Sequence, residues 1–375
     1  MAIDESSTKA SPADVKAATS ASPPPADATS AVPPAAATSA IPPAPSSATS
    51  PPEIDPESTI LSPDHFRAED LPEDADSCYN EDMLSSTASV NSSIMRYREV
   101  NGRTFHKEVG NAAYCHYVLQ LAVGSKLCLS PISSNIEKVI DIGTGTGTWA
   151  IDFADAYPDC SVIGTDVSPI QPSWVPPNLQ FQIDDCTQPW TFAESSADLV
   201  HARWMLGSIR DWTAFFKEAY RTLKPGGWLE SNEAGCGVVS DDNSIPPNSA
   251  MNQWGKIFAE GGSKIGQSFT IVDDGTQERA MHEAGFVNIQ KHQFKVPIGA
   301  WPKDPQKKEI GMGSQLALEQ DIEGYILFIA STVKGWSREQ IAVYIGHLRK
   351  ELRDPTHHAY YHLQVLCGQK PETEE

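Results

Sequence analysis

Three groups of residues have types and spacings that could do chemistry, and each follows a short apolar run. Glycine occupies every second position over residues 143–147, Asp166 comes later, and the pair Asp184-Asp185 later still. A glycine turn lets a ligand approach the backbone, and a carboxylate about twenty residues further on can bind both ribose hydroxyls. A carboxylate of the third group can accept a hydrogen bond from an adenine amino group. This order predicts a site for an adenosine-containing ligand.

Asp141, inside the apolar run before the turn, discriminates between two cofactors. A dinucleotide site has the pattern G-x-G-x-x-G or G-x-G-x-x-A. Read from Gly143, the sixth position is Thr148 and fails; read from Gly145, the match to Ala150 is loose. The charge of Asp141 would repel a phosphate and attract a cation. S-adenosylmethionine carries an ammonium and a sulfonium and no phosphate, so we favour it over NAD, the less favoured alternative.

Polar and aromatic residues after the fourth and fifth predicted strands form a second candidate group. His201 is the histidine near this edge whose ordinary pKa suits proton removal, and Glu233 is the second candidate base. The alternative for His201, which we favour, is a half-buried strand residue that stacks on a neighbour. Arg203 can orient the carboxylate of a molecule that accepts the methyl group, or it can pair with Glu233. A tryptophan in the position of Trp204 more often lines a pocket than stacks on a ligand. Asn232 is the last residue predicted to contact the molecule that accepts the methyl group.

Alternating strands and helices must position these residues. Short β-branched runs alternate with stretches of helical periodicity, a pattern typical of a largely parallel sheet with right-handed crossovers. The expected strands cover residues 139–142, 161–165, 178–183, 198–202, 228–231, 287–296 and 358–367. The expected helices cover residues 112–123, 146–157, 212–223, 251–260, 277–284 and 337–352.

Composition excludes several classes of function. The formal net charge of −21 argues against a dedicated nucleic-acid binder and against docking on an anionic membrane. Seven cysteines without a C-x-x-C pair indicate free thiols in a reducing compartment, and we expect no metal site. Without a membrane-length apolar run or a signal-peptide pattern, we expect a soluble protein of the cytoplasm, with the nucleus as a second location.

The chain divides into three parts by composition. Residues 1–60 are rich in Ala, Pro, Ser and Thr and predict a disordered tail, because such a segment cannot bury enough apolar surface to offset its chain entropy. Residues 61–93 are acidic and predict a solvated linker, with an interaction tail as the alternative. Order is expected from about Met95, with a turn at Asn101-Gly102, so residues 94–375 form the catalytic domain.

The sequence resembles the class I S-adenosylmethionine-dependent methyltransferases, and more narrowly the fungal LaeA-like family linked with secondary metabolism. The resemblance covers roughly Met95 to Pro371. Its most specific stretch is Ser168-Pro169-Ile170-Gln171-Pro172-Ser173-Trp174-Val175-Pro176-Pro177-Asn178. The remaining matches are the stretches 141–155, 162–167, 198–203, 223–230, 335–339 and 358–360.

The resemblance implies a Rossmann-like, seven-stranded α/β sheet with helices on both faces and an antiparallel last strand. It implies that Asp141 and the glycines hold the methionine end of the cofactor, Asp166 the ribose, and Asp185 with Cys186 the adenine. Asp185 is preferred to Asp184, for which a strand-end turn residue is an equally weighted alternative. The implied cofactor set is Asp141, Gly143, Thr144, Gly145, Gly147, Asp166, Val167, Asp185 and Cys186.

The leading hypothesis is a methyltransferase acting on a small-molecule hydroxyl or carboxylate in secondary metabolism. The alternative is a weakly catalytic or non-catalytic regulator that acts through protein partners. One departure from the family pattern concerns residues 107–113, which replace a longer acidic and aromatic segment that helps to cover the cofactor. The shortening predicts a more open pocket, weaker cofactor binding or a skipped exon.

Overall fold

The computed structural model describes residues 60–71 and 112–372, and a seven-stranded sheet is its centre. The strand order is β3-β2-β1-β4-β5-β7-β6. Strand β7 runs antiparallel to β5 and β6, whereas β1 to β5 are mutually parallel. The predicted fold class and the antiparallel C-terminal strand are confirmed. The bounds are β1 Lys138–Ile142, β2 Ser161–Asp166, β3 Leu179–Ile183, β4 Ala197–Arg203, β5 Leu223–Ala234, β6 Val287–Pro297 and β7 Tyr360–Gln369.

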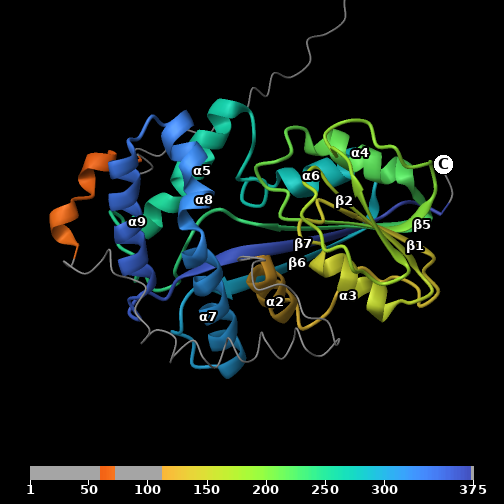
Figure 1. Ribbon diagram of the computed structural model, residues 1–375, viewed down its shortest axis with the longest axis horizontal. Helices are drawn as coiled ribbons and strands as arrows, with labels where there is room; N and C mark the ends of the chain where they lie inside the picture. The colour runs from red at the N-terminus through yellow and green to blue at the C-terminus, as the bar shows by residue number, and fades with distance from the viewer. Residues whose placement is uncertain (1–59, 72–111, 373–375) are drawn as a thin grey trace, which may run out of the picture. The chain divides into compact units, whose positions relative to one another are not determined.

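Helices cover both faces of this sheet, which explains why its central strands are apolar on both sides. Val139 and Ile140 are adjacent in β1 and point to opposite faces, and both are buried. Val139 packs in the cluster that contains α3 (Thr148–Ala156), and Ile140 in the one that contains α4 (Trp212–Thr222) and α6 (Thr276–Glu283). Figure 1 shows α3 on one side of the sheet and α4 with α6 on the other.

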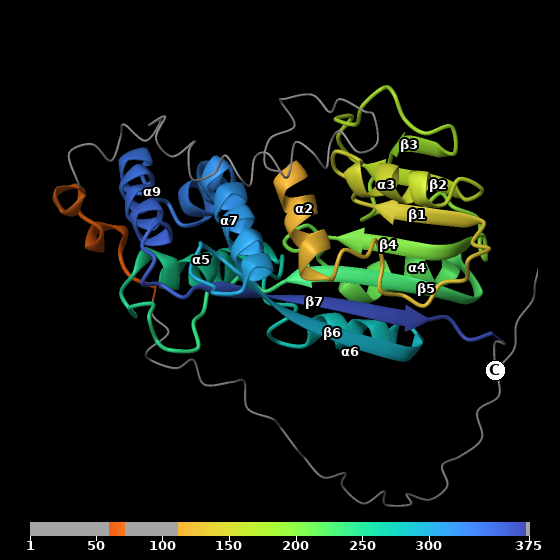
Figure 2. The same ribbon diagram turned by 90° about the horizontal axis from the view of Figure 1, so that it is seen from below.

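A group of helices lies beyond the carboxyl ends of the parallel strands. In Figure 2 the arrows of β1, β4 and β5 point toward this group, and β7 points away from it. Two of its helices, α7 and α8, were not predicted, because their sequences lack a strong helical repeat of apolar residues. The buried face of α7 consists largely of small residues, including Gly313, Ser314 and Ala317. The group comprises α2 (Ala112–Ala122), α5 (Ala250–Ile265), α7 (Pro305–Gln320), α8 (Ile322–Leu327), the π-helical turn η4 (Phe328–Val333) and α9 (Arg338–Leu352).

Residues 60–71 correct part of the linker prediction. They form two short 3₁₀ turns, η2 (Pro63–His65) and η3 (Ala68–Asp70), and Phe66 is 7 % exposed. The Phe66 ring makes an edge contact with Tyr344 of α9, at 5.2 Å between centroids. A buried aromatic ring offsets the entropy of ordering this acidic stretch, so residues 60–71 are anchored at Phe66 while most of their other side chains stay exposed.

Several expectations lie outside the described residues. These are the tail 1–59, the linker remainder 72–93, the start of order near Met95, the turn at Asn101-Gly102 and most of the shortened segment 107–113. Within the described ranges, none of the helices has the length and apolar character needed to cross a lipid bilayer.

Candidate functional site

The turn between β1 and α3 brings backbone rather than side chains to a cavity. Gly143 and Gly145 have φ angles of +68° and +57°, a region that favours glycine. A Cβ atom on Gly143 would overlap the sulfur of Met205, so its backbone must approach that side chain closely. A Cβ atom on Gly145 would meet no atom within 4 Å. The space beside Gly145 is therefore free to take a ligand.

Asp141 places a nearly buried carboxylate beside this turn. It is 3 % exposed, and it lines the cavity. Its Oδ2 atom accepts a hydrogen bond from the Thr144 hydroxyl at 2.6 Å, and its Oδ1 atom lies 2.7 Å from Nδ1 of His201. The parallel register of β1 and β4 sets Asp141 against His201. The arrangement holds negative charge at the cavity wall, which favours a cationic group.

His201, the first candidate base, lies deep inside the protein. It is 1 % exposed, and its ring stacks on the indole of Trp149 with centroids 3.7 Å apart and an interplanar angle of 4°. Asp141 lines the cavity beside the glycine turn, whereas His201 is not among the described residues that line it. This position fits the stacked strand residue that the sequence favours for His201, and its catalytic role stays a prediction.

Asp166 ties the glycine turn to the end of β2. Its Oδ2 atom accepts from the N–H of Gly145 at 2.8 Å, and its Oδ1 atom accepts from the N–H of Ser168 at 2.9 Å. Gln171 adds a second tie, because its amide donates to the carbonyl of Gly145 at 2.6 Å. Each carboxylate oxygen has a further lone pair, so Asp166 can still accept from hydroxyls.

The two carboxylates after β3 are held differently. Asp185 accepts from the hydroxyl and the N–H of Thr187, and these bonds lower the pKa of Asp185. Asp184 accepts from the hydroxyl of Thr191 at 3.1 Å. Both follow the carboxyl end of β3, and their contact with adenine stays a prediction.

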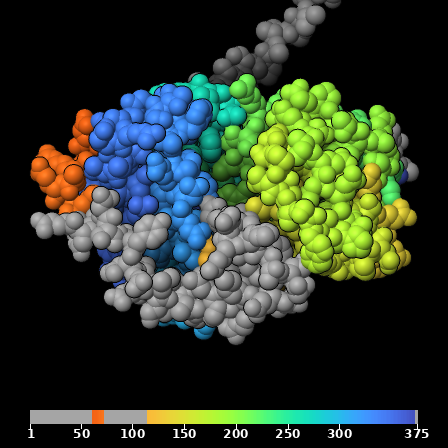
Figure 3. All heavy atoms as spheres, in the orientation of Figure 1, coloured from red at the N-terminus to blue at the C-terminus, as the bar shows by residue number. Residues whose placement is uncertain are grey.

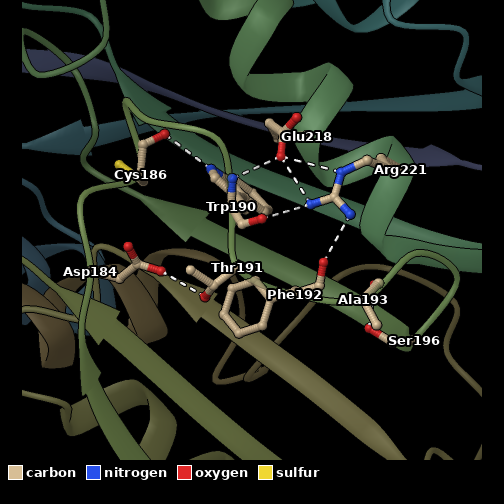
Figure 4. A network of polar contacts seen from close by, with 9 residues as sticks. All are labelled: Asp184, Cys186, Trp190, Thr191, Phe192, Ala193, Ser196, Glu218 and Arg221. Carbon is tan, nitrogen blue, oxygen red and sulfur yellow. Dashed lines mark hydrogen bonds and ion pairs between the residues drawn. The ribbon is translucent and has the colours of Figure 1, made fainter. Parts of the chain in front are cut away.

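The segment that follows Cys186 is braced by α4 (Figure 4). The indole N–H of Trp190 donates to the carbonyl of Cys186 at 3.0 Å, and the Trp190 N–H donates to Glu218 at 2.9 Å. Arg221 donates to the carbonyls of Phe192 and Trp190 at 2.8 Å and 3.0 Å. These bonds satisfy backbone groups of an irregular segment and fix the position of Cys186.

A cavity of about 450 Å³ extends from the glycine turn into the helical group. Its volume falls in the usual range for small-molecule sites. Figure 3 shows a depression between the yellow-green half of the molecule and the blue helices. Of the predicted cofactor set, four residues line this cavity, namely Asp141, Gly143, Thr144 and Gly145. The other five lie outside its lining, namely Gly147, Asp166, Val167, Asp185 and Cys186.

His116 is a cavity residue that sequence reasoning missed. It lies on α2, 2 % exposed, between Asp152 of α3 and Arg203 of β4. Arg203 can only donate, so Nδ1 of His116 accepts from its Nη2 at 3.1 Å, and Nε2 donates to Asp152 at 3.0 Å. Burial lowers the pKa of His116 despite Asp152. The site therefore holds a neutral imidazole that orients the Arg203 guanidinium.

Comparisons with known proteins give the chain a family. Residues 111–291 match a family model described as a methyltransferase domain. Methyltransferase pytC of Aspergillus terreus is 35% identical over 304 residues, which cover 77% of this chain and 93% of pytC. The chain belongs to this methyltransferase family. The secondary metabolism regulator LAE1 of Cochliobolus heterostrophus is 32% identical, covering 68% of this chain and 85% of LAE1. The protein-methionine methyltransferase laeA of Emericella nidulans is 28% identical, covering 77% of this chain and 80% of laeA.

In this methyltransferase, Glu233 and Asn232 face inward rather than toward the large cavity. Glu233 is 0 % exposed, and its two oxygens accept from the N–H groups of Met205 and Leu206, both at 3.0 Å. The Asn232 side-chain oxygen has no hydrogen-bond partner among the described residues, and Asn232 lines a separate space of about 10 Å³. β5 places both side chains inside the protein, and a direct role of either residue at the acceptor stays a prediction.

Trp204 does line the large cavity, as the wall predicted for it. It is 40 % exposed, and its φ of +57° is uncommon for a bulky residue. Its N–H donates to the carbonyl of Asn232 at 3.1 Å, which holds this unusual backbone in place. Glu233 and Asn232 thus bind the backbone of residues 204–206 and hold Trp204 at the cavity.

Glu233 makes the stability of the methyltransferase depend on pH. Burial raises its pKa from 4.5 to about 8, so the folded state binds this proton more tightly than the unfolded state. The stability from Glu233 is complete below pH 4.5 and is lost as the pH rises through 8. In Glu233→Gln, which cannot titrate, the free energy of unfolding should fall less over this interval, by up to about 1.4 kcal/mol per pH unit. Urea unfolding at several pH values measures the difference, and parallel pH curves would contradict the role of Glu233.

Proposed function

We propose that the protein is an S-adenosylmethionine-dependent methyltransferase that acts on a small-molecule hydroxyl or carboxylate. The observation that carries the proposal is one cavity that joins Asp141 and the open backbone at Gly145 to a chamber between the sheet and the helical group. A nearly buried carboxylate at that point suits a cationic cofactor and disfavours a phosphate. Membership of a methyltransferase family supports the same function.

The residues present fit the cofactor. Asp141 would face its cationic methionine end, and the open position at Gly145 would let the ligand lie against the backbone. Asp166 would accept from the ribose hydroxyls, and Asp185 from the adenine amino group beside Cys186. S-adenosylmethionine supplies a methyl group on a sulfonium that is already activated for displacement. The protein's own task is to align the acceptor with that methyl group.

His116 replaces His201 as the histidine placed to serve a hydroxyl acceptor. Its ring lines the cavity, and burial favours its neutral form. To take a proton, Nδ1 of His116 would have to exchange its hydrogen bond from Arg203 for one from the acceptor hydroxyl. Asp152 holds the opposite ring nitrogen and would stabilise the charged form. A carboxylate acceptor needs no proton removal, and for it Arg203 would supply the orienting charge.

Replacing Asp166 tests the cofactor assignment. Asp166→Ala removes the ribose acceptor and releases the N–H of Gly145, so the affinity for S-adenosylmethionine should fall at least about tenfold, which corresponds to about 1.4 kcal/mol. Isothermal titration calorimetry measures this change. An Asp166→Ala variant that binds as tightly as the parent would refute the ribose assignment. Wild-type protein without heat or a thermal shift at millimolar cofactor would refute the enzyme proposal.

The alternative is a regulator of secondary metabolism that acts through protein partners. It is favoured by the similarity to LAE1, whose name describes it as such a regulator. A regulator that does not depend on the cofactor should keep its effect on metabolite profiles when Asp141 is replaced by asparagine. A profile identical to that of the deletion strain would instead support the enzyme.

A further inference from the structure

Aromatic side chains line the part of the cavity that lies against α5. Trp254 and Phe258 of α5 have ring centroids 4.9 Å apart, and Phe258 and Phe269 have centroids 5.3 Å apart. Trp204 and Tyr361 contribute a second pair, with centroids 6.2 Å apart. Two groups of rings therefore face one chamber, and such rings bind flat apolar ligands by stacking and edge contacts.

Glycines and small residues leave room for the aromatic wall, which we define as the rings of Trp254, Phe258 and Phe269. The ring of Phe269 lies where a Cβ atom on Gly207 or on Gly262 would be, so glycine at both positions makes room for it. On the opposite side, α7 lines the chamber with the small residues Ser314 and Ala317. The glycines leave space for one aromatic ring, and the small residues of α7 leave space beside that helix. Together they create apolar volume that a tightly packed core would fill.

Polar groups line another part of the same cavity. Asp141, His116 and Arg203 are among its polar lining residues, and two of them come from β1 and β4 of the sheet. Val238, Phe258 and Ile298 line it from one apolar cluster that also contains residues of α5 and α9. An acceptor that satisfies both parts needs a polar group at one end of an apolar body. A small polar acceptor would leave the aromatic wall without a contact.

We propose that the methyl acceptor has an apolar, ring-containing body that lies against the Trp254–Phe258–Phe269 wall, with the group to be methylated directed toward the glycine turn. This substrate class rests on the proposed methyltransferase function. The transfer forms a bond from the acceptor oxygen to the methyl carbon and breaks the carbon–sulfur bond. The proton of a hydroxyl acceptor goes to Nδ1 of His116, which gives up its hydrogen bond from Arg203, and a carboxylate acceptor has no proton to lose.

A ring-containing probe tests the proposal. 2-Naphthol, titrated into wild-type protein saturated with S-adenosylhomocysteine, should quench tryptophan fluorescence, whereas serine, a polar hydroxyl compound, should not. In Ala317→Trp, which fills the chamber from α7, the affinity for 2-naphthol should fall tenfold or more while calorimetry shows unchanged cofactor binding. Gln320→Leu is the matched control, because it adds an apolar side chain on the exposed end of the same helix and should change neither affinity.

The outcomes separate this proposal from the proposed function. Cofactor binding without 2-naphthol binding, or equal 2-naphthol affinity in wild type and Ala317→Trp, would overturn the substrate class alone. Binding of 2-naphthol without cofactor binding would overturn the methyltransferase proposal and leave an apolar ligand site. Should Ala317→Trp fail to fold, Ser314→Leu fills the same chamber one turn earlier and is judged by the same criteria.

Discussion

Asp141→Asn should weaken S-adenosylmethionine binding by about 30-fold or more, the largest effect that we expect on the cofactor site. The substitution keeps the shape of the side chain and removes the negative charge at the cavity wall. A nearly buried charge acts through a low local dielectric, and removing one partner of such a contact typically costs at least about 2 kcal/mol, which corresponds to that factor. Isothermal titration calorimetry at constant ionic strength measures the change.

Asp159→Asn is the matched control, because Asp159 is an exposed carboxylate beyond the end of α3. It removes the same charge from the chain and leaves the cavity intact, so its cofactor affinity should equal that of wild type. Equal losses in both variants would indicate a general charge effect. An Asp141→Asn variant with wild-type affinity would mean that the cationic end of the ligand binds elsewhere.

His201→Phe should lower the free energy of unfolding by about 2–3 kcal/mol, the largest stability effect that we expect at the site. Phenylalanine retains a flat ring that can stack on Trp149, but it cannot bond to Asp141. The carboxylate then keeps its bond from Thr144 and loses its contact with the imidazole. Urea unfolding of the variant and of wild type measures the loss.

A double-mutant cycle assigns this loss to the His201–Asp141 contact. His201→Phe should cost less when Asp141→Asn is already present, because a neutral amide suffers less than a carboxylate from a missing partner. His282→Phe, at an exposed position of α6, should cost little in either background. Additive effects of His201→Phe and Asp141→Asn would show that His201 stabilises the protein by stacking alone.

The glycine turn and its flanking elements could be predicted from sequence because their causes are local. A short run of consecutive buried residues, rich in β-branched side chains, specifies β1, and glycines at positive φ specify the turn that follows. Asp166 and Asp185 could be placed near one edge because parallel strands carry their carboxyl ends to the same side of a sheet. The helix α7 could not be predicted, because its buried face is largely made of small residues that produce little hydrophobic periodicity.

The sequence by itself determined the sheet, the glycine turn and the carboxylates that suit a cationic adenosine cofactor. The tertiary structure alone decided which polar residues meet the cavity. His201 and Glu233 lie near the carboxyl ends of β4 and β5, yet packing buries both, whereas His116 lines the cavity from a helix that precedes the sheet. The aromatic chamber likewise combines α5, α7 and the ends of β4 and β7. Contacts among elements so distant in the chain depend on how whole faces pack, and residue spacing does not encode that packing.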